Sequence, residues 1–438
     1  MNREMLKTFI LGVLVALSFL LSYILWSYQP KYEMFYDADY ISEADIGGKE
    51  RTKNDLIRPK QIVFHNHQAL QQLELLGFKK PSDEHLFYKE ISTWPLSDIK
   101  IEKNRSRNIE PQESHYVEIA FPSMQSGQLL ENIFTFNKDV EFPTWPFERV
   151  FIVVHDENEL TVRVHSTDHS QLWEATVEKA GAYQAIQEYN GEHPHLQSYV
   201  NVSFGAEPIY IPETTPKLTK KTLVANELNP ELFVNALFNN PSLVKPNQQK
   251  SFFTDGQRGM RIFQDRRYLE FINPIEMNDD KLESTALIDR SIAHINEHKG
   301  WINEYHLESA NSISGKIKYR LHYDGVPVFD FNNLSVIEQI WRDEDLHQYR
   351  RSLLQFGHLL NVTEVELPDS NLVIRALLKN EDYELDKIYD IRLAYDLNYI
   401  NEVHSLTLEP AWFIQYEYNW IRLSFTENDT DYIGIRGD

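Results

Sequence analysis

The stretch T-F-I-L-G-V-L-V-A-L-S-F-L-L-S-Y-I-L-W, which runs from Thr8 to Trp26, decides how the rest of the chain is organised. Its nineteen residues carry no charge. As a helix rising about 1.5 Å per residue it would extend about 28 Å, close to the hydrocarbon thickness of a bilayer. Arg3 and Lys7 precede it, whereas acidic residues follow from Glu33 onward. The positive-inside rule therefore predicts a single-pass transmembrane helix over residues 8–26, with residues 1–7 in the cytoplasm and the bulk of the chain extracytoplasmic.

A cleaved secretory signal peptide is the alternative interpretation of this stretch. The apolar run is longer than the usual core of a signal peptide, and residues 22–31 contain no A-x-A cleavage site. These two features favour an uncleaved anchor in the cell membrane.

Small and hydroxyl-bearing residues recur along the predicted transmembrane helix at intervals of four. Thr8, Gly12 and Ala16 form a small-x-x-x-small line, and Ser18 and Ser22 lie on an adjoining face. Small residues let a second helix backbone approach closely, and serine hydroxyls can hydrogen-bond across a helix pair. We therefore hypothesise that these five residues contact partner helices. The alternative, that small residues fall in an anchor by chance, stays open.

The composition limits the classes of partner and of chemistry. The 438 residues include 43 lysines and arginines against 66 acidic residues, a net charge of −23. Such acidity argues against nucleic acid as a partner and against broad contact with anionic surfaces. The chain has no cysteine, which excludes disulfides, thiolate metal sites and cysteine nucleophiles. Its length beyond the anchor predicts two or three domains.

Changes in composition suggest where those domains begin and end. Residues 27–58 are polar with little apolar periodicity, which is typical of a juxtamembrane stalk. An N-terminal α+β domain is expected over residues 59–212, up to a passage rich in proline and threonine. A middle α+β domain over residues 213–300 and a C-terminal α+β domain over residues 301–438 follow.

Periodicity predicts antiparallel sheets with covering helices, so the fold class is α+β. Alternation over Tyr116–Phe121 indicates a strand, with Val117, Ile119 and Phe121 on one face. Asp324-Gly325 is a strong hairpin signal between two alternating runs. Helices are expected from about 67 to 76, from about 172 to 185, from 284 to 298 and from about 369 to 379, together with strands over 259–263 and 268–272.

Motifs for the common enzyme chemistries are absent from the sequence. It contains no phosphate-binding glycine loop, no G-x-S-x-G and no H-E-x-x-H. Acidic pairs such as Asp279-Asp280 and the run 343–345 could serve a glycosidase, but chance pairs are expected among so many carboxylates. We therefore predict a protein that is not an enzyme, with no catalytic, cofactor-binding or metal-binding residues.

Histidine pairs are the nearest approach to a metal site. They are His294 with His298, His165 with His169, and His193 with His195. Two nitrogens without a third ligand nearby are weak evidence for a metal. His294 and His298 lie four residues apart near a predicted helix end, where a partly exposed histidine stabilised by the helix dipole is the simpler interpretation.

A series of short motifs along the whole chain resembles the YycH family. The motifs are the anchor ending in Trp26-Ser-Tyr-Gln-Pro30, Arg58-Pro-Lys-Gln-Ile-Val-Phe-His65, Ala236-Leu-Phe238, Phe253-Thr-Asp-Gly256, Tyr268-Leu-Glu-Phe-Ile-Asn-Pro274, Tyr323-Asp-Gly-Val-Pro-Val-Phe329 and Leu408-Glu-Pro-Ala-Trp-Phe413. None of them is catalytic, and it is their order along the chain that makes the resemblance.

The resemblance implies a non-enzymatic, membrane-anchored regulator in a Gram-positive bacterium. Members of this family act on the sensor histidine kinase YycG, also called WalK, whose pathway controls cell-wall metabolism. A sister protein, YycI, is the implied second partner, through transmembrane and extracytoplasmic contacts. Two alternatives remain open: an extracytoplasmic hydrolase that acts on the cell wall, and a scaffold that binds exported proteins without regulating a kinase.

Overall fold

The computed structural model describes residues 14, 15, 17 and 18 and then residues 44–425, apart from 68–72, 104–108, 137–139, 158, 190–192, 206, 264–266, 275–282 and 343. The chain forms two compact units, residues 1–42 and residues 43–438. In the first unit, the four described residues are helical. No helix of the described part is both long and apolar enough to cross a membrane, and most of the predicted span 8–26 lies outside the described residues.

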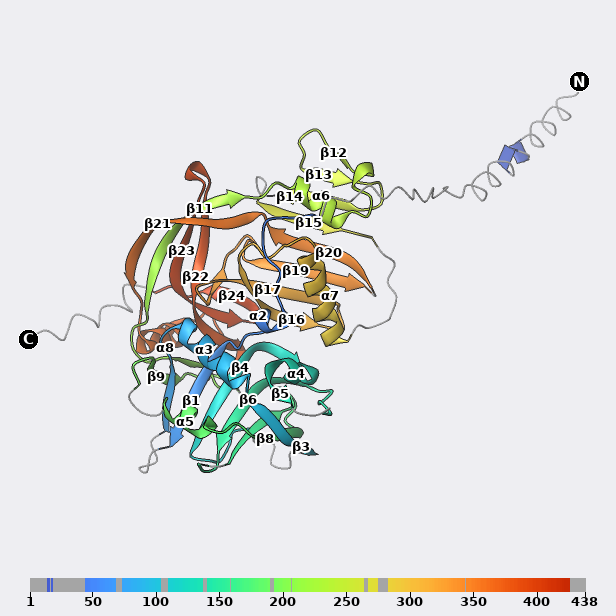
Figure 1. Ribbon diagram of the computed structural model, residues 1–438. Helices are drawn as coiled ribbons and strands as arrows, with labels where there is room; N and C mark the ends of the chain where they lie inside the picture. The colour runs from blue at the N-terminus through green and yellow to red at the C-terminus, as the bar shows by residue number, and fades with distance from the viewer. Residues whose placement is uncertain are drawn as a thin grey trace, which may run out of the picture. The chain divides into compact units, whose positions relative to one another are not determined.

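The second unit, which we call the body, contains two large sheets, drawn from blue to green and from green to red in Figure 1. We call the part of the body that carries the first sheet its first half, and the part that carries the second sheet its second half. The first has the order β10-β9-β2-β1-β4-β6-β7-β8-β3-β5. Its strands are β1 (Gln61–His67), β2 (Leu73–Phe78), β3 (Pro95–Lys103), β4 (His115–Ser126), β5 (Thr135–Phe136), β6 (Pro146–Val154), β7 (Leu160–His165), β8 (Gln171–Val177), β9 (Leu196–Asn201) and β10 (Tyr210–Pro212).

The second sheet has the order β12-β13-β14-β15-β20-β19-β17-β18-β22-β23-β11-β21, with β16 beside β17 and β24 beside β23. Strands from both sides of residue 300 belong to this one sheet, since β15 pairs with β20, although the sequence suggests a domain boundary at that position. Its strands are β11 (Lys217–Glu227), β12 (Lys245–Pro246), β13 (Phe252–Thr254), β14 (Gly259–Phe263), β15 (Tyr268–Ile272), β16 (Glu304–Asn311), β17 (Lys316–Tyr323), β18 (Val326–Phe329), β19 (Val336–Arg342), β20 (Asp345–Ser352), β21 (Leu354–Glu366), β22 (Ile388–Ile400), β23 (Ser405–Tyr416) and β24 (Asn419–Arg422).

Short helices cover parts of these sheets. Phe64 of β1 packs against Phe87 of α3, and α7 lies against β16 and β17 (Figure 1). At the start of α8, the Asp369 carboxylate accepts a hydrogen bond from the amide of Leu372, as an N-cap does. The helices are α2 (Lys53–Leu56), α3 (Pro81–Ile91), α4 (Leu130–Ile133), α5 (Ala182–Gln187), α6 (Glu231–Leu237), α7 (Ser284–Glu297) and α8 (Ser370–Lys379).

The two sheets share one continuous hydrophobic core. Polar contacts also join them: Lys60 pairs with Asp390 at 3.0 Å, and the Thr285 hydroxyl donates to Gln128 at 2.9 Å. The Asp324-Gly325 turn packs so closely on α3 that a Cβ at Gly325 would lie 2.6 Å from Cβ of Pro81. The unit 43–438 is therefore held together by packing between its halves as well as within them.

The predicted α+β fold class is confirmed, but two predicted helices are wrong. Of the predicted helix 67–76, the described residues 67 and 73–76 lie instead in β1 and β2, and Gly77 is required because a side chain there would overlap the ring of Tyr199 on β9. Over residues 172–185 the chain forms β8, whose Trp173, Ala175 and Val177 alternate inward, before the short α5. In both places pairing with neighbouring strands of the sheet overrides the local helical pattern.

Candidate functional site

Residues 44–58, which we call the strap, form the segment that connects residues 1–42 to the first strand of the body. The sequence analysis assigns residues 27–58 to a stalk, yet the described residues 44–58 pack against the second sheet and α7. Ile46, Leu56 and Ile57 are buried, at 4%, 1% and 3% exposure. Apolar side chains in a polar segment thus attach the strap to the body.

The outer strap, residues 44–51, is held mainly through main-chain hydrogen bonds to the end of α7. Its amides at Ile46, Gly48 and Lys49 donate to the carbonyls of residues 298, 299 and 301, at 3.0, 3.0 and 3.2 Å. Ile46 is its only buried side chain among the described residues. Burial of one isoleucine contributes about 1.5–3 kcal/mol, so the outer strap is held by a small apolar contact and a row of main-chain bonds.

Asn296 is the side chain that fixes the outer strap in register. Its amide group donates to the carbonyl of Arg51 at 2.9 Å, and its Oδ1 accepts from the Arg51 amide at 2.9 Å. The same Oδ1 accepts from the indole N–H of Trp301 at 2.8 Å. Ion pairs lie further out, with Asp45 2.7 Å from Lys299 and both side chains largely exposed. The asparagine therefore links the strap to a buried tryptophan.

Gly48 marks the closest approach of the strap to the body. A Cβ at this position would lie 2.6 Å from the carbonyl oxygen of Trp301 and even closer to that of Lys299. Both atoms are main chain and cannot move aside as a flexible side chain could. Glycine is thus required at position 48 for the strap to dock in this register.

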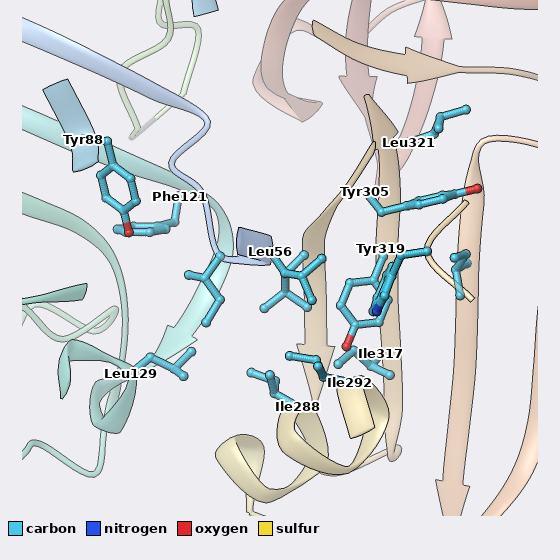
Figure 2. Packing of buried hydrophobic residues seen from close by; sticks show 14 of the residues in the cluster. Leu56, Tyr88, Phe121, Leu129, Ile288, Ile292, Tyr305, Ile317, Tyr319 and Leu321 are labelled. Atoms are coloured by element: carbon cyan, nitrogen blue, oxygen red, sulfur yellow. The ribbon is translucent and has the colours of Figure 1, made fainter. Parts of the chain in front are cut away.

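The inner strap, residues 52–58, is built into the core. Thr52 and Asp55 form a capping box at the start of α2, where each side chain accepts from the other residue's amide. Leu56 belongs to the same core cluster as Leu129 and Ile288, all three labelled in Figure 2, and α2 contacts both α4 in the first half and α7 in the second half. The inner strap therefore lies between the two halves of the body, directly after the loosely held outer strap.

A second feature is a set of buried polar side chains on the outward face of the first sheet, His65, Glu118, Arg149 and Tyr210, which we call the carboxylate cluster. His65 Nε2 and the Tyr210 hydroxyl each lie 3.0 Å from the carboxylate of Glu118, and Arg149 forms an ion pair with it. Burial alone would raise the pKa of Glu118, but the hydrogen bond from His65 and the charge of Arg149 hold it below its usual range. A buried, ionised and fully paired carboxylate results.

A cavity of about 200 Å³ lies beside this cluster. Its lining includes His65, Tyr116, Tyr210, Glu110 and Asn201. The His65 ring stacks on Tyr116 with 4.2 Å between centroids. Among the described residues, the lining offers hydrogen-bonding groups, with the rings of His65, Tyr116 and Tyr210 beside polar groups that include Glu110 and Asn201.

Histidines also take part in a buried group in the second half, His294, His298, Tyr349 and Arg351, which we call the histidine cluster. Nε2 of Gln339 lies 3.1 Å from Nδ1 of His294, and Arg351 donates to the Tyr349 hydroxyl at 2.9 Å. Burial lowers the pKa of His294 to about 4, and burial with the nearby His294 and Arg351 lowers that of His298 well below 6.5. The predicted partly exposed histidine at the helix end is wrong for His298, which is 2% exposed, whereas His294 is half-buried.

The other histidine pairs lie in polar surroundings. Burial lowers the pKa of His165 to about 4, and His169 lies 3.8 Å from Glu207. His195 pairs with Asp83 at 2.7 Å, and its ring centroid is 5.3 Å from that of His193. Within the described ranges no three histidine or carboxylate side chains gather as a metal site would require. Asp279, Asp280 and residue 343 lie outside the described residues.

The predicted partner-helix residues fall almost entirely outside the described part of the chain. Thr8, Gly12, Ala16 and Ser22 are not among the described residues, whereas Ser18 is helical and exposed. Their role stays a prediction. The strap, by contrast, was missed as a functional segment, although Thr52-x-x-Asp55 before Leu56-Ile57 is a helix-start signal that could have located its inner part.

Comparison with known proteins gives the family. The sequence model described as "YycH protein, N-terminal domain" matches residues 4–192, and that described as "YycH protein, C-terminal domain" matches residues 206–430. The chain belongs to the YycH family. Family membership therefore covers both halves of the body and most of the segment before the strap.

YycH of Bacillus subtilis illustrates the similarity in sequence and in structure. The strain 168 protein named "Two-component system WalR/WalK regulatory protein YycH" is 22% identical, over 94% of this chain and 94% of that protein. The crystal structure of YycH from Bacillus subtilis superposes with a TM-score of 0.71 at 20% identity, over 87% of this chain and 99% of that one. The solved structure thus shares the fold of both sheets.

Proposed function

We propose that this chain is a membrane-anchored, non-enzymatic regulator of the sensor histidine kinase WalK, also called YycG, and through it of cell-wall metabolism. The observation that supports this most is the match over nearly the whole chain to a YycH-family protein named as a WalR/WalK regulatory protein. A regulator needs surfaces and a connection to the membrane rather than an active site. The chemistry of the carboxylate cluster agrees with that role.

The proposal includes the topology and partners that the sequence suggests. Residues 8–26 would span the cell membrane once, with residues 1–7 in the cytoplasm and residues 27–438 outside. YycI would be the second partner beside the kinase. Transmembrane contacts would use Thr8, Gly12, Ala16, Ser18 and Ser22, and the exterior domains would supply further contacts.

Deletion of the protein tests the regulatory proposal. Kinase phosphorylation, followed on Phos-tag gels of the response regulator, should change in the deletion strain and return when the full chain is supplied. A scaffold that binds exported proteins without regulating the kinase predicts unchanged phosphorylation, and that result would overturn the proposal.

Leucine substitutions test the transmembrane part separately. Gly12→Leu with Ala16→Leu should reduce co-purification of the kinase several-fold, because bulky side chains keep helix backbones apart. The matched control is Leu14→Ile with Leu17→Ile, which changes the same helix without enlarging any residue. Undiminished co-purification of the double leucine variant would remove the transmembrane contact from the proposal.

A further inference from the structure

The outer strap is the least firmly held part of the path between residues 1–42 and the body. Among residues 44–51 only Ile46 is buried, and the remaining side chains are half-buried or exposed. When main-chain bonds at a surface open, water replaces both partners, so their net contribution is small. Segments with few buried apolar contacts are the ones that open locally while the rest of a protein stays folded.

The inner strap cannot follow in the same motion. Leu56 and Ile57 are 1% and 3% exposed, and the capping box holds α2 in place. Their side chains belong to the core that joins the two halves. Opening is thus confined to residues 44–51, which end where Asn296 binds the main chain of Arg51.

We infer that the outer strap is a releasable latch, docked on the end of α7 in one state and free in another. In the docked state, the outer strap fixes the point at which the chain leaves the body toward residues 1–42. In the free state, residues 44–51 add their length to the segment that connects the body to residues 1–42. This inference rests on the proposed function, since it makes the latch the element through which the exterior domains and the N-terminal segment influence each other.

Release has a defined consequence for the body. The carbonyls of residues 298, 299 and 301 lose the amides that now bind them, and Ile46 leaves its contact. Trp301 Nε1 keeps its bond to Asn296, because that bond does not involve the strap. The binding surface at the end of α7 therefore stays formed and can take the strap back.

A single cysteine reports the state of the latch. The chain has no cysteine, so Ile46→Cys in the full-length protein in membranes gives one thiol, and its rate of alkylation by a maleimide measures exposure. We expect alkylation at least tenfold slower than at Thr363→Cys, an exposed position on β21. Equal rates at the two positions would overturn the docked state.

Gly48→Ala should open the latch without changing any residue of the hydrophobic core. The new methyl group would collide with the carbonyls of residues 299 and 301. Alkylation of the Ile46→Cys thiol should then rise at least tenfold, and kinase phosphorylation should move toward that of the deletion strain. The matched control is Gly205→Ala, where the nearest atom to the new Cβ is 3.9 Å away; it should leave both readouts unchanged. Asn296→Ala, which removes two bonds to the strap without a collision, repeats the test should Gly48→Ala not accumulate.

Re-closing the latch completes the test. Asp45 and Lys299 are ion-paired and accessible, so Asp45→Cys with Lys299→Cys can be joined by a flexible bis-maleimide. In the Asn296→Ala background, where no side chain blocks docking, this cross-link should restore the phosphorylation seen with the unmodified chain. Fast alkylation of the thiol at position 46 in Gly48→Ala with unaltered phosphorylation would overturn the inference. Unaltered phosphorylation in the deletion strain would instead overturn the proposed function.

Discussion

Two buried polar clusters, one in each half of the body, accommodate a buried charge in different ways. In the carboxylate cluster, Glu118 is 2% exposed and receives a histidine, an arginine and a tyrosine. In the histidine cluster, Arg351 is fully buried, yet no described carboxylate lies within ion-pair distance of it. Its guanidinium instead donates to the Tyr349 hydroxyl and lies 5.2 Å from the ring centroid of Phe233.

The difference decides which charge each cluster tolerates. A carboxylate with three partners keeps its charge, and removal of that charge leaves Arg149 with only the exposed Glu207 as an ion-pair partner. Burial keeps both neighbouring histidines neutral, and at His298 the charges of His294 and Arg351 add to this effect. The first cluster should therefore be sensitive to substitution, and the second to acid.

Substitution of Glu118 should have the largest effect on stability. Glu118→Gln keeps the shape of the side chain but leaves Arg149 without its buried partner, and loss of one partner of a buried pair costs about 3–5 kcal/mol. Urea denaturation of the purified chain, followed by circular dichroism, measures this loss. Glu364→Gln on exposed β21 is the matched control and should change the free energy of unfolding by less than about 0.5 kcal/mol. Equal effects of the two variants would erase the contrast between the clusters.

Acid should weaken the histidine cluster first. The pKa of His294 is lowered to about 4 in the folded chain, against about 6.5 when unfolded. Its neutral form is thus stabilised by folding: the contribution is complete above pH 6.5 and falls as pH decreases toward 4, by on the order of 3 kcal/mol in total. For Glu118, whose pKa is lowered, stability is instead lost only below the unfolded value of about 4.5.

Denaturation midpoints measured from pH 7.5 to 3.5 separate these two windows. The full chain should lose stability between pH 6.5 and 4.5, and His294→Gln should flatten that part of the curve. His169→Gln, which removes a half-exposed histidine, should leave the slope in place. An unaltered slope in His294→Gln would show that this ring does not set the pH dependence.

Local patterns in the sequence predicted the elements that depend on near neighbours. Helices α7 and α8 and strands β14 and β15 agree with prediction, since period and capping are encoded within a few residues. The outer strap could not be found in this way. Gly48 meets main chain about 250 residues away, and nothing near position 48 indicates that contact.

The two clusters could not be predicted from the sequence, for a related reason. Alternation over Tyr116–Phe121 places Glu118 on the face opposite Val117, where a carboxylate is expected to meet water. Tyr210, from another part of the chain, covers it. His298 was likewise expected near solvent, but Tyr349 and Arg351 on β20 lie beside it, and its carbonyl binds the strap. Burial of a polar group depends on distant segments, so its partners emerge only from the fold.

Arg351→Met is the substitution with the smallest expected effect, and it tests the contrast most directly. One of its guanidinium nitrogens, Nη2, has no hydrogen-bond partner among the described residues, so the desolvation of the arginine is poorly compensated. Replacement of such a buried charge by an apolar side chain of similar length is often neutral or stabilising. We expect the free energy of unfolding at pH 7.5 to change by less than about 1 kcal/mol.

The same variant also predicts a shift in acid sensitivity. With the arginine removed, one source of positive charge beside His298 disappears, so the folded-state pKa of His298 should move back toward its ordinary value. The fall in stability on acidification should still begin near the unfolded value of about 6.5 but should be smaller. Arg149→Met provides the comparison in the carboxylate cluster, where it should cost several kcal/mol at pH 7.5 because Glu118 loses its main countercharge. A loss in Arg351→Met as large as that in Arg149→Met would mean that the two buried arginines are stabilised alike, and the distinction between the clusters would fail.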